Sequence, residues 1–200
     1  MTAAKQQDSG GRLFYLMGPS GAGKDSLLDA CRGRRVAGHR LRIAPRYITR
    51  QEDSVGEDHI ALTPEAFRQY RDSGRFALHW QANGQHYGIG TEVDQWLADG
   101  DVVLVNGSRA RLDQALERYA DLVVPVLICV DPENQRQRLL NRGRETPAEI
   151  DARIERSRRL QSDMEDRFIT IRNDGTLAYA THQLLAVINN QLSDRVLVSG

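Results

Sequence analysis

Residues 18–24 read GPSGAGK, a spacing of glycines and lysine that can hold a chain of phosphates. A short apolar run, residues 12–17, precedes this stretch, and a segment with helical spacing follows it. Glycines let backbone N–H groups approach phosphates closely, and the start of the following helix adds partial positive charge. The motif in this context predicts a P-loop that binds ATP, with Lys24 reaching the outer phosphates. Its residues are Gly18, Pro19, Ser20, Gly21, Ala22, Gly23 and Lys24.

Asp25 stands where this motif normally has the Ser or Thr that meets Mg²⁺. A carboxylate oxygen is also a good ligand for that ion. We therefore expect Mg²⁺ to accompany ATP, held by Asp25 or, after a small shift of the chain, by Ser26. The alternative is that Asp25 only stabilises the N-terminus of the helix, where negative charge is favourable.

Composition limits the classes of partner. The chain has 200 residues and zero formal net charge, so it has no overall basic field to attract nucleic acid or an anionic membrane. No apolar run approaches the ~20 residues of a membrane span, and the first residues lack a secretory signal. Cys31 and Cys129 lie far apart without metal-site spacing, which favours reduced thiols. We expect a cytoplasmic protein that binds neither nucleic acid nor membrane.

Predicted strands alternate with predicted helices along the chain. This order favours an α/β fold with a mostly parallel sheet covered by helices on both faces. Residues 46–90 break the alternation and form a candidate inserted lobe. Helix starts are predicted at Thr63, followed by Pro64, and at two capping boxes that begin with Thr91 and Thr146. Residues 1–11 and 195–200 are expected to be tails, with the N-terminal one mobile.

With these segments in view, the chain resembles the guanylate kinase family of P-loop kinases over nearly its whole length. The similar segments are GPSGAGK, RYITR, RFALHWQANGQHYG, RLLNRGRETPAEIDARI and RNDG. The resemblance implies one P-loop kinase domain, residues 12–194. It further implies a small substrate-binding lobe near residues 46–90 and a mobile helical lid near residues 136–160.

Site residues follow from the same resemblance. It implies that Lys24, Arg142 and Arg153 are catalytic, and that Arg50 and Tyr87 hold the acceptor phosphate. The alternative for the two lid arginines is a solvated helix surface, because they lie within a run of arginines. Asn173 and Asp174 are expected beside adenine, or alternatively only in the turn that their residue types favour. Further candidates for substrate binding are Arg46, His79, Asn106, Ser108 and Arg109.

The chain departs from guanylate kinases where that family reads guanine. His79 stands in place of a base-gripping Glu, and VLVNGSRA replaces an Asp-x-Asp strand end. The segments GKDS, PRYITR, HIAL, ALHW, YGIG, VNGSRA and NRGRE are similar to a branch that phosphorylates a sugar bisphosphate, ribose 1,5-bisphosphate. That resemblance implies formation of 5-phosphoribosyl 1-diphosphate and ADP in phosphonate degradation. The alternatives are a true guanylate kinase and a non-catalytic binding module. Such modules tend to lose the P-loop lysine and lid arginines, which this chain keeps.

Overall fold

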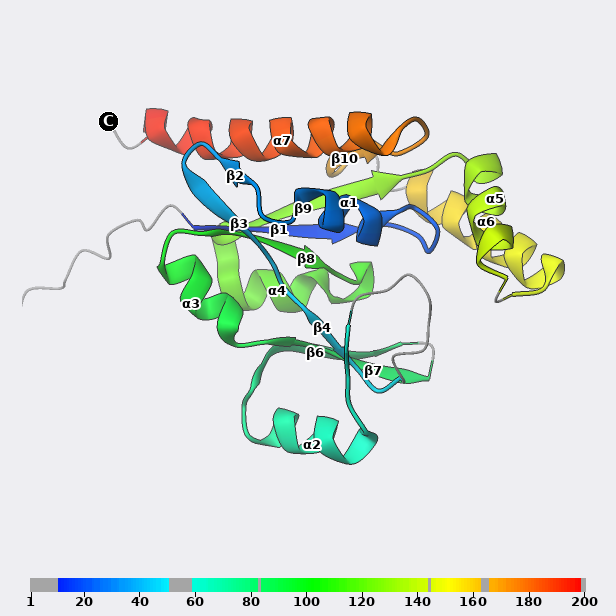
Figure 1. Ribbon diagram of the computed structural model, residues 1–200, viewed down its shortest axis with the longest axis horizontal. Helices are drawn as coiled ribbons and strands as arrows, with labels where there is room; N and C mark the ends of the chain where they lie inside the picture. Colours follow the sequence, from blue (N-terminus) through cyan, green and yellow to red (C-terminus); the bar gives the residue numbers. More distant parts are fainter. Residues whose placement is uncertain (1–10, 51–58, 83, 144, 163–165, 199–200) are drawn as a thin grey trace, which may run out of the picture.

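The computed structural model describes residues 11–50, 59–82, 84–143, 145–162 and 166–198. Within these ranges, strands and helices alternate around a large sheet, and a smaller sheet lies beside it (Figure 1). The arrangement confirms the predicted α/β class. The predicted mobile tail, apart from Gly11, lies outside the described residues.

The large sheet has six strands, and all its neighbouring pairs are parallel except the pair at one edge. Parallel pairing requires crossover connections, and here helices supply most of them. The spatial order is β10 (Ile169–Arg172), β9 (Val123–Cys129), β1 (Arg12–Met17), β8 (Val102–Asn106), β3 (His39–Ile43) and β2 (Arg35–Val36). The antiparallel pair is β2 with β3.

Both faces of this sheet are buried, because helices pack on each of them. Alternate side chains of each strand point to opposite faces. Phe14 and Leu16 of β1 face α1 (Lys24–Cys31) and α7 (Leu177–Val198). Tyr15 faces the other side, where α3 (Glu92–Ala98) and α4 (Leu112–Tyr119) pack. Figure 1 shows α7 along one side of the sheet and α4 along the other. The continuous apolar runs of the central strands follow from this double coverage.

The smaller sheet lies within the predicted inserted lobe. Its spatial order is β5 (Ile60–Ala61), β4 (Arg46–Ile48), β7 (Gln85–Gly90) and β6 (Phe76–Ala82). Figure 1 shows the chain passing from β3 of the large sheet directly toward β4 of the small one. Helix α2 (Pro64–Asp72) covers the outer side, where Phe67 packs on Phe76 with ring centroids 4.6 Å apart. The predicted cap is confirmed, since Thr63 accepts a hydrogen bond from the Ala66 amide.

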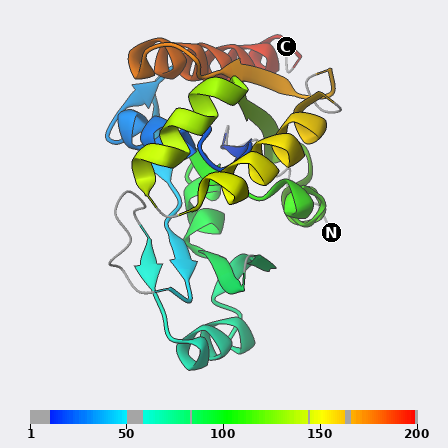
Figure 2. The same cartoon turned by 90° about the vertical axis from the view of Figure 1, so that its right-hand side faces the viewer.

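Helices α5 (Pro132–Arg142) and α6 (Pro147–Ser162) follow β9 and cross the carboxyl end of the large sheet (Figure 2). The predicted capping box of α6 is confirmed. The Thr146 amide donates to the Glu149 carboxylate over 2.8 Å, and the Glu149 amide donates to the Thr146 hydroxyl over 3.4 Å. The start of α6 is therefore defined by residues close in sequence.

Two local predictions were wrong. Thr91 does not cap α3 with its side chain, because its own backbone is already helical, at φ −71° and ψ −6°. Residues 195–198, predicted to be tail, are the last turn of α7. No proline or glycine interrupts that segment before Gly200, so nothing local ends the helix earlier.

The packing of α7 on the sheet gives a stability prediction. Leu184 is 0% exposed against the large sheet, whereas Leu177 of the same helix is 41% exposed. Leu184→Ala should lower the free energy of unfolding by about 2–5 kcal/mol, because it leaves a cavity. Leu177→Ala is the matched control and should change it by about 0.5 kcal/mol or less. Urea unfolding measures both, and equal losses would contradict this packing.

Candidate active site

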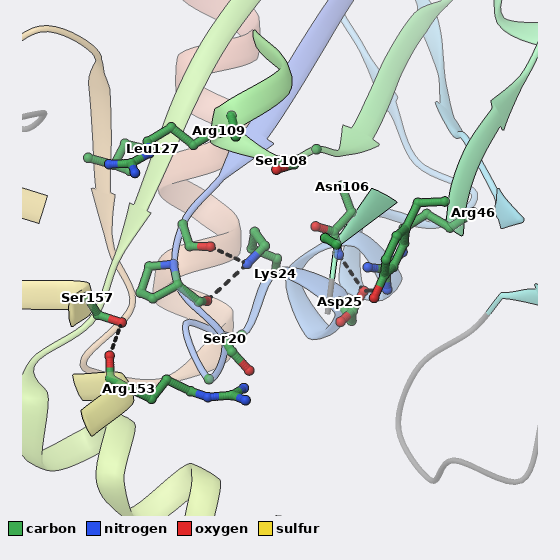
Figure 3. A pocket seen from close by; sticks show the side chains of 18 of the residues that line it. Ser20, Lys24, Asp25, Arg46, Asn106, Ser108, Arg109, Leu127, Arg153 and Ser157 are labelled. Atoms are coloured by element: carbon green, nitrogen blue, oxygen red, sulfur yellow. Dashed lines mark hydrogen bonds and ion pairs between the residues drawn. The ribbon is translucent and has the colours of Figure 1, made fainter. Parts of the chain in front are cut away.

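A cavity of about 550 Å³ lies where the phosphate loop, the small sheet and α6 meet (Figure 3). It opens at the carboxyl ends of β1 and β8, the edge at which open α/β sheets bind ligands. Its volume falls in the usual range for small-molecule sites. Most of the predicted site residues line it: Gly18, Pro19, Ser20, Gly21, Gly23, Lys24, Asp25, Arg46, Tyr87, Asn106, Ser108, Arg109, Arg142 and Arg153.

The phosphate loop turns tightly between β1 and α1. Gly23 has φ +83°, and a Cβ atom there would lie 2.4 Å from Asn173 Nδ2. Gly18 is equally close to the backbone of β9, since its Cβ would lie 2.3 Å from the Ile128 carbonyl oxygen. Lys24 Nζ donates to the Gly18 and Pro19 carbonyls over 2.7 and 3.0 Å. Its ammonium group therefore lies across the start of the loop, at the cavity wall (Figure 3).

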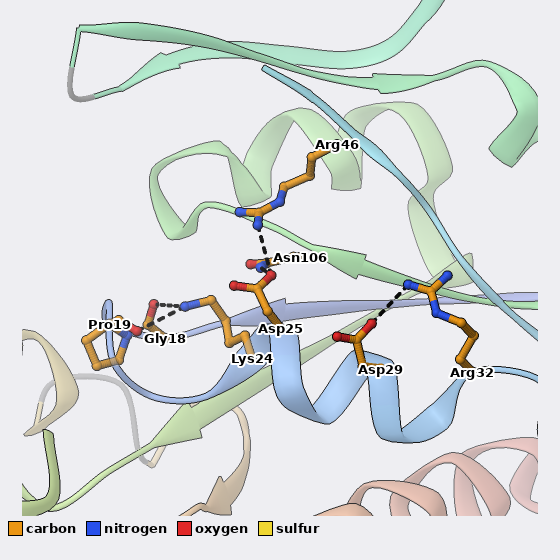
Figure 4. Close-up of polar contacts among 8 residues, drawn as sticks. All are labelled: Gly18, Pro19, Lys24, Asp25, Asp29, Arg32, Arg46 and Asn106. Carbon is orange, nitrogen blue, oxygen red and sulfur yellow. Dashed lines mark hydrogen bonds and ion pairs between the residues drawn. The ribbon is translucent and has the colours of Figure 1, made fainter. Parts of the chain in front are cut away.

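Asp25 joins three separate elements. Its Oδ1 accepts hydrogen bonds from Arg46 at 2.8 Å and from Asn106 Nδ2 at 2.7 Å (Figure 4). These partners come from β4 of the small sheet and from the end of β8. The Arg46 side chain is only 12% exposed, so this charged bond is partly shielded from water. Asp25 thus ties the phosphate loop to the small sheet.

Tyr15 shapes the turn that follows β8. Its hydroxyl donates to the Ser108 carbonyl and accepts from the Ser108 amide, each over 3.0 Å. Burial raises the pKa of Tyr15 to about 12, so the hydroxyl stays protonated at neutral pH. A Cβ atom on Gly107 would lie 2.1 Å from the Tyr15 ring, so only glycine fits there. Tyr15 was missed by the sequence interpretation, because within a buried strand it is indistinguishable from core.

Two aromatic side chains form a wall of the cavity. Trp80 and Tyr87 pair directly across β6 and β7, and their rings stack with centroids 5.4 Å apart and an interplanar angle of 5°. Both line the cavity. Trp80 also packs in the core beneath the small sheet, where it is only 7% exposed.

Arginines from the helix pair cover the opposite wall. Arg142 ends α5, and Arg153 lies nearly two turns into α6, where it pairs with Glu145 over 3.0 Å. Arg156 and Ser157 also line the cavity and were missed. Their spacing of three and four residues from Arg153 places them on the same helix face, which is a signal that the sequence contained.

Several predicted site residues do not line the cavity: Ala22, Ser26, Arg50, His79, Asn173 and Asp174. Ser26 is exposed on α1. His79 is exposed on β6, one residue before Trp80, and successive side chains of a strand point to opposite faces. Although its side chain is exposed, neighbouring groups partly desolvate the ring, and together with nearby Arg71 and Arg111 this lowers the pKa of His79. Arg50 follows β4 at the edge of the described residues.

Asn173 and Asp174 form a turn that supports the phosphate loop. Asn173 is 4% exposed, and its Nδ2 donates to the Ala22 carbonyl over 2.8 Å. Asp174 accepts a hydrogen bond from the Asp131 amide at the start of α5. Both side chains therefore take part in the turn that their residue types favour, and their place beside adenine stays a prediction.

Three further features of the described residues concern membranes, metals and thiols. Within the described residues, no helix is long and apolar enough to cross a membrane. The same residues contain no cluster of three His, Cys, Asp or Glu side chains suited to a metal. Cys31 and Cys129 are buried and unbonded to each other, and burial raises the pKa of the Cys31 thiol to about 11. A thiol with that pKa is a weak nucleophile at neutral pH.

The fold and the phosphate loop define a P-loop kinase. A guanylate kinase from Anaplasma phagocytophilum has a similar structure, with a TM-score of 0.67 and 16% identity, covering 94% of this chain and 89% of that one. A gluconokinase from Sinorhizobium meliloti 1021 is similar with a TM-score of 0.53 and 16% identity, covering 97% and 100%. At this identity the likeness concerns the fold alone.

The chain belongs to the PhnN family of ribose 1,5-bisphosphate phosphokinases. The protein of that name from Azotobacter vinelandii is 50% identical over 182 residues, which cover 91% of this chain and 98% of the relative. The one from Pseudomonas fluorescens is 49% identical, covering 90% and 96%. The one from Yersinia pestis is 45% identical, covering 92% and 96%. No protein-family model matches the chain.

Proposed function

We propose that the chain transfers the γ-phosphoryl group of ATP to the 1-phosphate of ribose 1,5-bisphosphate, giving 5-phosphoribosyl 1-diphosphate and ADP. The charge of the cavity carries this proposal. Six cationic side chains line it: Lys24, Arg46, Arg109, Arg142, Arg153 and Arg156. Among its described lining residues, Asp25 is the only acid, and Arg46 and Asn106 already bind it. Such a site suits two polyphosphorylated substrates and offers no other carboxylate to read a guanine.

The reaction needs little covalent chemistry from the protein. The nucleophile is an oxygen of the acceptor phosphate, whose second pKa of about 6 leaves it largely ionised at neutral pH. A general base is therefore not required. The protein contributes positioning and neutralisation of charge as the phosphoryl group moves between two oxygens.

Each wall of the cavity has a role in this proposal. The phosphate loop and Lys24 hold the donor, and we assign Arg46, Tyr87 and Arg109 to the phosphates of the acceptor. Asn106 and Ser108 suit the ribose hydroxyls, because both present neutral polar groups at the cavity wall. We assign Arg142 and Arg153 to the transferring group. On this basis the small sheet belongs to a substrate lobe, residues 46–90, and the helix pair to a lid, residues 136–160.

Mg²⁺ fits beside Asp25. Both hydrogen bonds of Asp25 go to Oδ1, so Oδ2 is the oxygen that suits a metal or a metal-bound water. Asp25 lines the cavity directly after Lys24, whereas Ser26 does not line it. We therefore favour Asp25 over Ser26. When bound, Mg²⁺ would neutralise charge on the phosphates of ATP.

Removing the Asp25 carboxylate tests this assignment. Asp25→Ala should raise the Mg²⁺ concentration for half-maximal rate by about tenfold or more. Asp25→Asn should raise it too, while keeping an oxygen for Arg46 and Asn106, so the acceptor KM should change less than in the Ala variant. Asp25→Ser should keep more kinase activity than Asp25→Ala, because serine is the residue that this motif normally has. An Mg²⁺ titration that is unchanged in Asp25→Ala would limit Asp25 to anchoring its two partners.

The acceptor is tested by direct comparison. Release of ADP should be rapid with ribose 1,5-bisphosphate and slower with GMP by up to about 10⁴-fold in kcat/KM, because a guanine edge would find no matching acids. Both acceptors are supplied at equal concentration with Mg²⁺ and ATP. A reaction without acceptor corrects for ATP hydrolysis. Efficient GMP turnover with no turnover of the bisphosphate would refute the proposal in favour of guanylate kinase.

A further inference from the structure

Three carbonyl groups of the phosphate loop accept hydrogen bonds from side chains outside the loop. The Ser20 carbonyl accepts from Gln135 Nε2 over 2.8 Å, and the Gly21 carbonyl accepts from Arg138 over 3.3 Å. The next carbonyl, that of Ala22, accepts from Nδ2 of the Asn173 side chain. Two of these three donors belong to α5, the first helix of the pair. The conformation of the loop is therefore coupled to the position of α5.

One of these donors, Gln135, also bonds to the lid helix α6. Its Nε2 also lies 3.2 Å from the Ser157 hydroxyl of α6, and this hydroxyl donates to the Arg153 carbonyl over 2.9 Å. Figure 3 shows Ser157 and Arg153 joined in this way beside the loop. A continuous chain of hydrogen bonds thus runs from the Ser20 carbonyl to the residue that carries a lid guanidinium.

The surroundings of Gln135 favour a neutral amide. The residue is only 1% exposed, so a charged group there would be strongly desolvated. The amide nitrogen has two N–H groups, which match its two acceptors. Gly21 lies directly against it, since a Cβ atom on Gly21 would be 3.3 Å from Gln135 Cγ. The glutamine side chain therefore fills the space beside Gly21, and both of its N–H groups have an acceptor.

We propose that Gln135 is a positioning residue that couples the phosphate loop to the lid helix α6. A trans peptide holds its C=O and N–H on opposite sides. Fixing the Ser20 carbonyl toward α5 therefore directs the Gly21 amide away from α5, for donation to a phosphate. Through Ser157, the same side chain sets the place of the helix that carries Arg153. Gln135 does not line the cavity, so it acts through these groups. The inference rests on the proposed phosphoryl transfer.

Gln135→Met tests this role, because methionine keeps the volume and loses both hydrogen bonds. We expect the dissociation constant of ADP, measured by calorimetry, to rise about tenfold, and kcat to fall by about 10²-fold as Arg153 is misplaced. Amide exchange in the peptides that cover residues 18–23 should become faster. Gln137→Met is the matched control on the exposed side of α5, and should leave all three quantities unchanged.

Ser157→Ala distinguishes the effect of the Gln135 bond to α6 from the effect of its bond to the loop. It breaks the bond to α6 and keeps the bond to the Ser20 carbonyl, so kcat should fall about tenfold with unchanged ADP affinity. Native ADP affinity, loop exchange and kcat in Gln135→Met would overturn the proposal. Equal loss of ADP affinity in Ser157→Ala would overturn it as well. If Gln135→Met does not fold, Ser157→Ala decides, and a native kcat there contradicts the coupling.

The nucleotide measurements keep this inference separate from the proposed reaction. ADP binding and loop exchange need no acceptor, so they report on Gln135 even if the bisphosphate is not turned over. A native chain that binds ADP yet leaves ribose 1,5-bisphosphate unchanged would refute the proposed acceptor alone. In that case kcat is measured with the acceptor that the native chain does phosphorylate.

Discussion

The phosphate loop is the constraint on which the rest of the site depends. Five successive carbonyls, from Gly18 to Ala22, accept hydrogen bonds from side chains: Lys24 of the first helix, Gln135 and Arg138 of α5, and Asn173 after β10. Buried carbonyls need such partners. Because these donors come from separate segments, α1, α5 and the turn after β10 must all be in place for the loop to keep this shape.

The charge of the side chains that line the cavity is the second constraint. The whole chain is neutral, yet the described lining of the cavity has six cations and a single carboxylate. Asp25 bonds to Arg46 and Asn106 from the start of α1, so the carboxylate also orders two groups that we assign to the acceptor. An aspartate in this position therefore links the donor side of the cavity to the acceptor side, which a serine is too short to do in the same way.

Local patterns predicted much of this architecture. The glycines before Lys24, the buried strands and the Thr63 and Thr146 caps each depend on residues close in sequence, and all appear as expected. Contacts between distant segments were beyond such patterns. Tyr15 reads as core, and nothing adjacent to Gln135 shows that it meets a loop 115 residues earlier. Thr91 and His79 show that a suitable residue type is not enough. The helical backbone of Thr91 prevents the predicted side-chain cap, and strand alternation directs His79 away from the cavity.

The central claim is that this cavity moves a phosphoryl group from a nucleotide onto a sugar phosphate. ATP labelled at its γ-phosphate with ³²P tests it directly, when mixed with the native chain, Mg²⁺ and ribose 1,5-bisphosphate. The account predicts that the label appears in the outer phosphate of the 1-diphosphate group of 5-phosphoribosyl 1-diphosphate. It also predicts that Lys24→Ala lowers the rate of transfer by about 10²–10³-fold with the fold intact. Label that appears only as inorganic phosphate, or equal transfer by the Lys24→Ala chain, would contradict it.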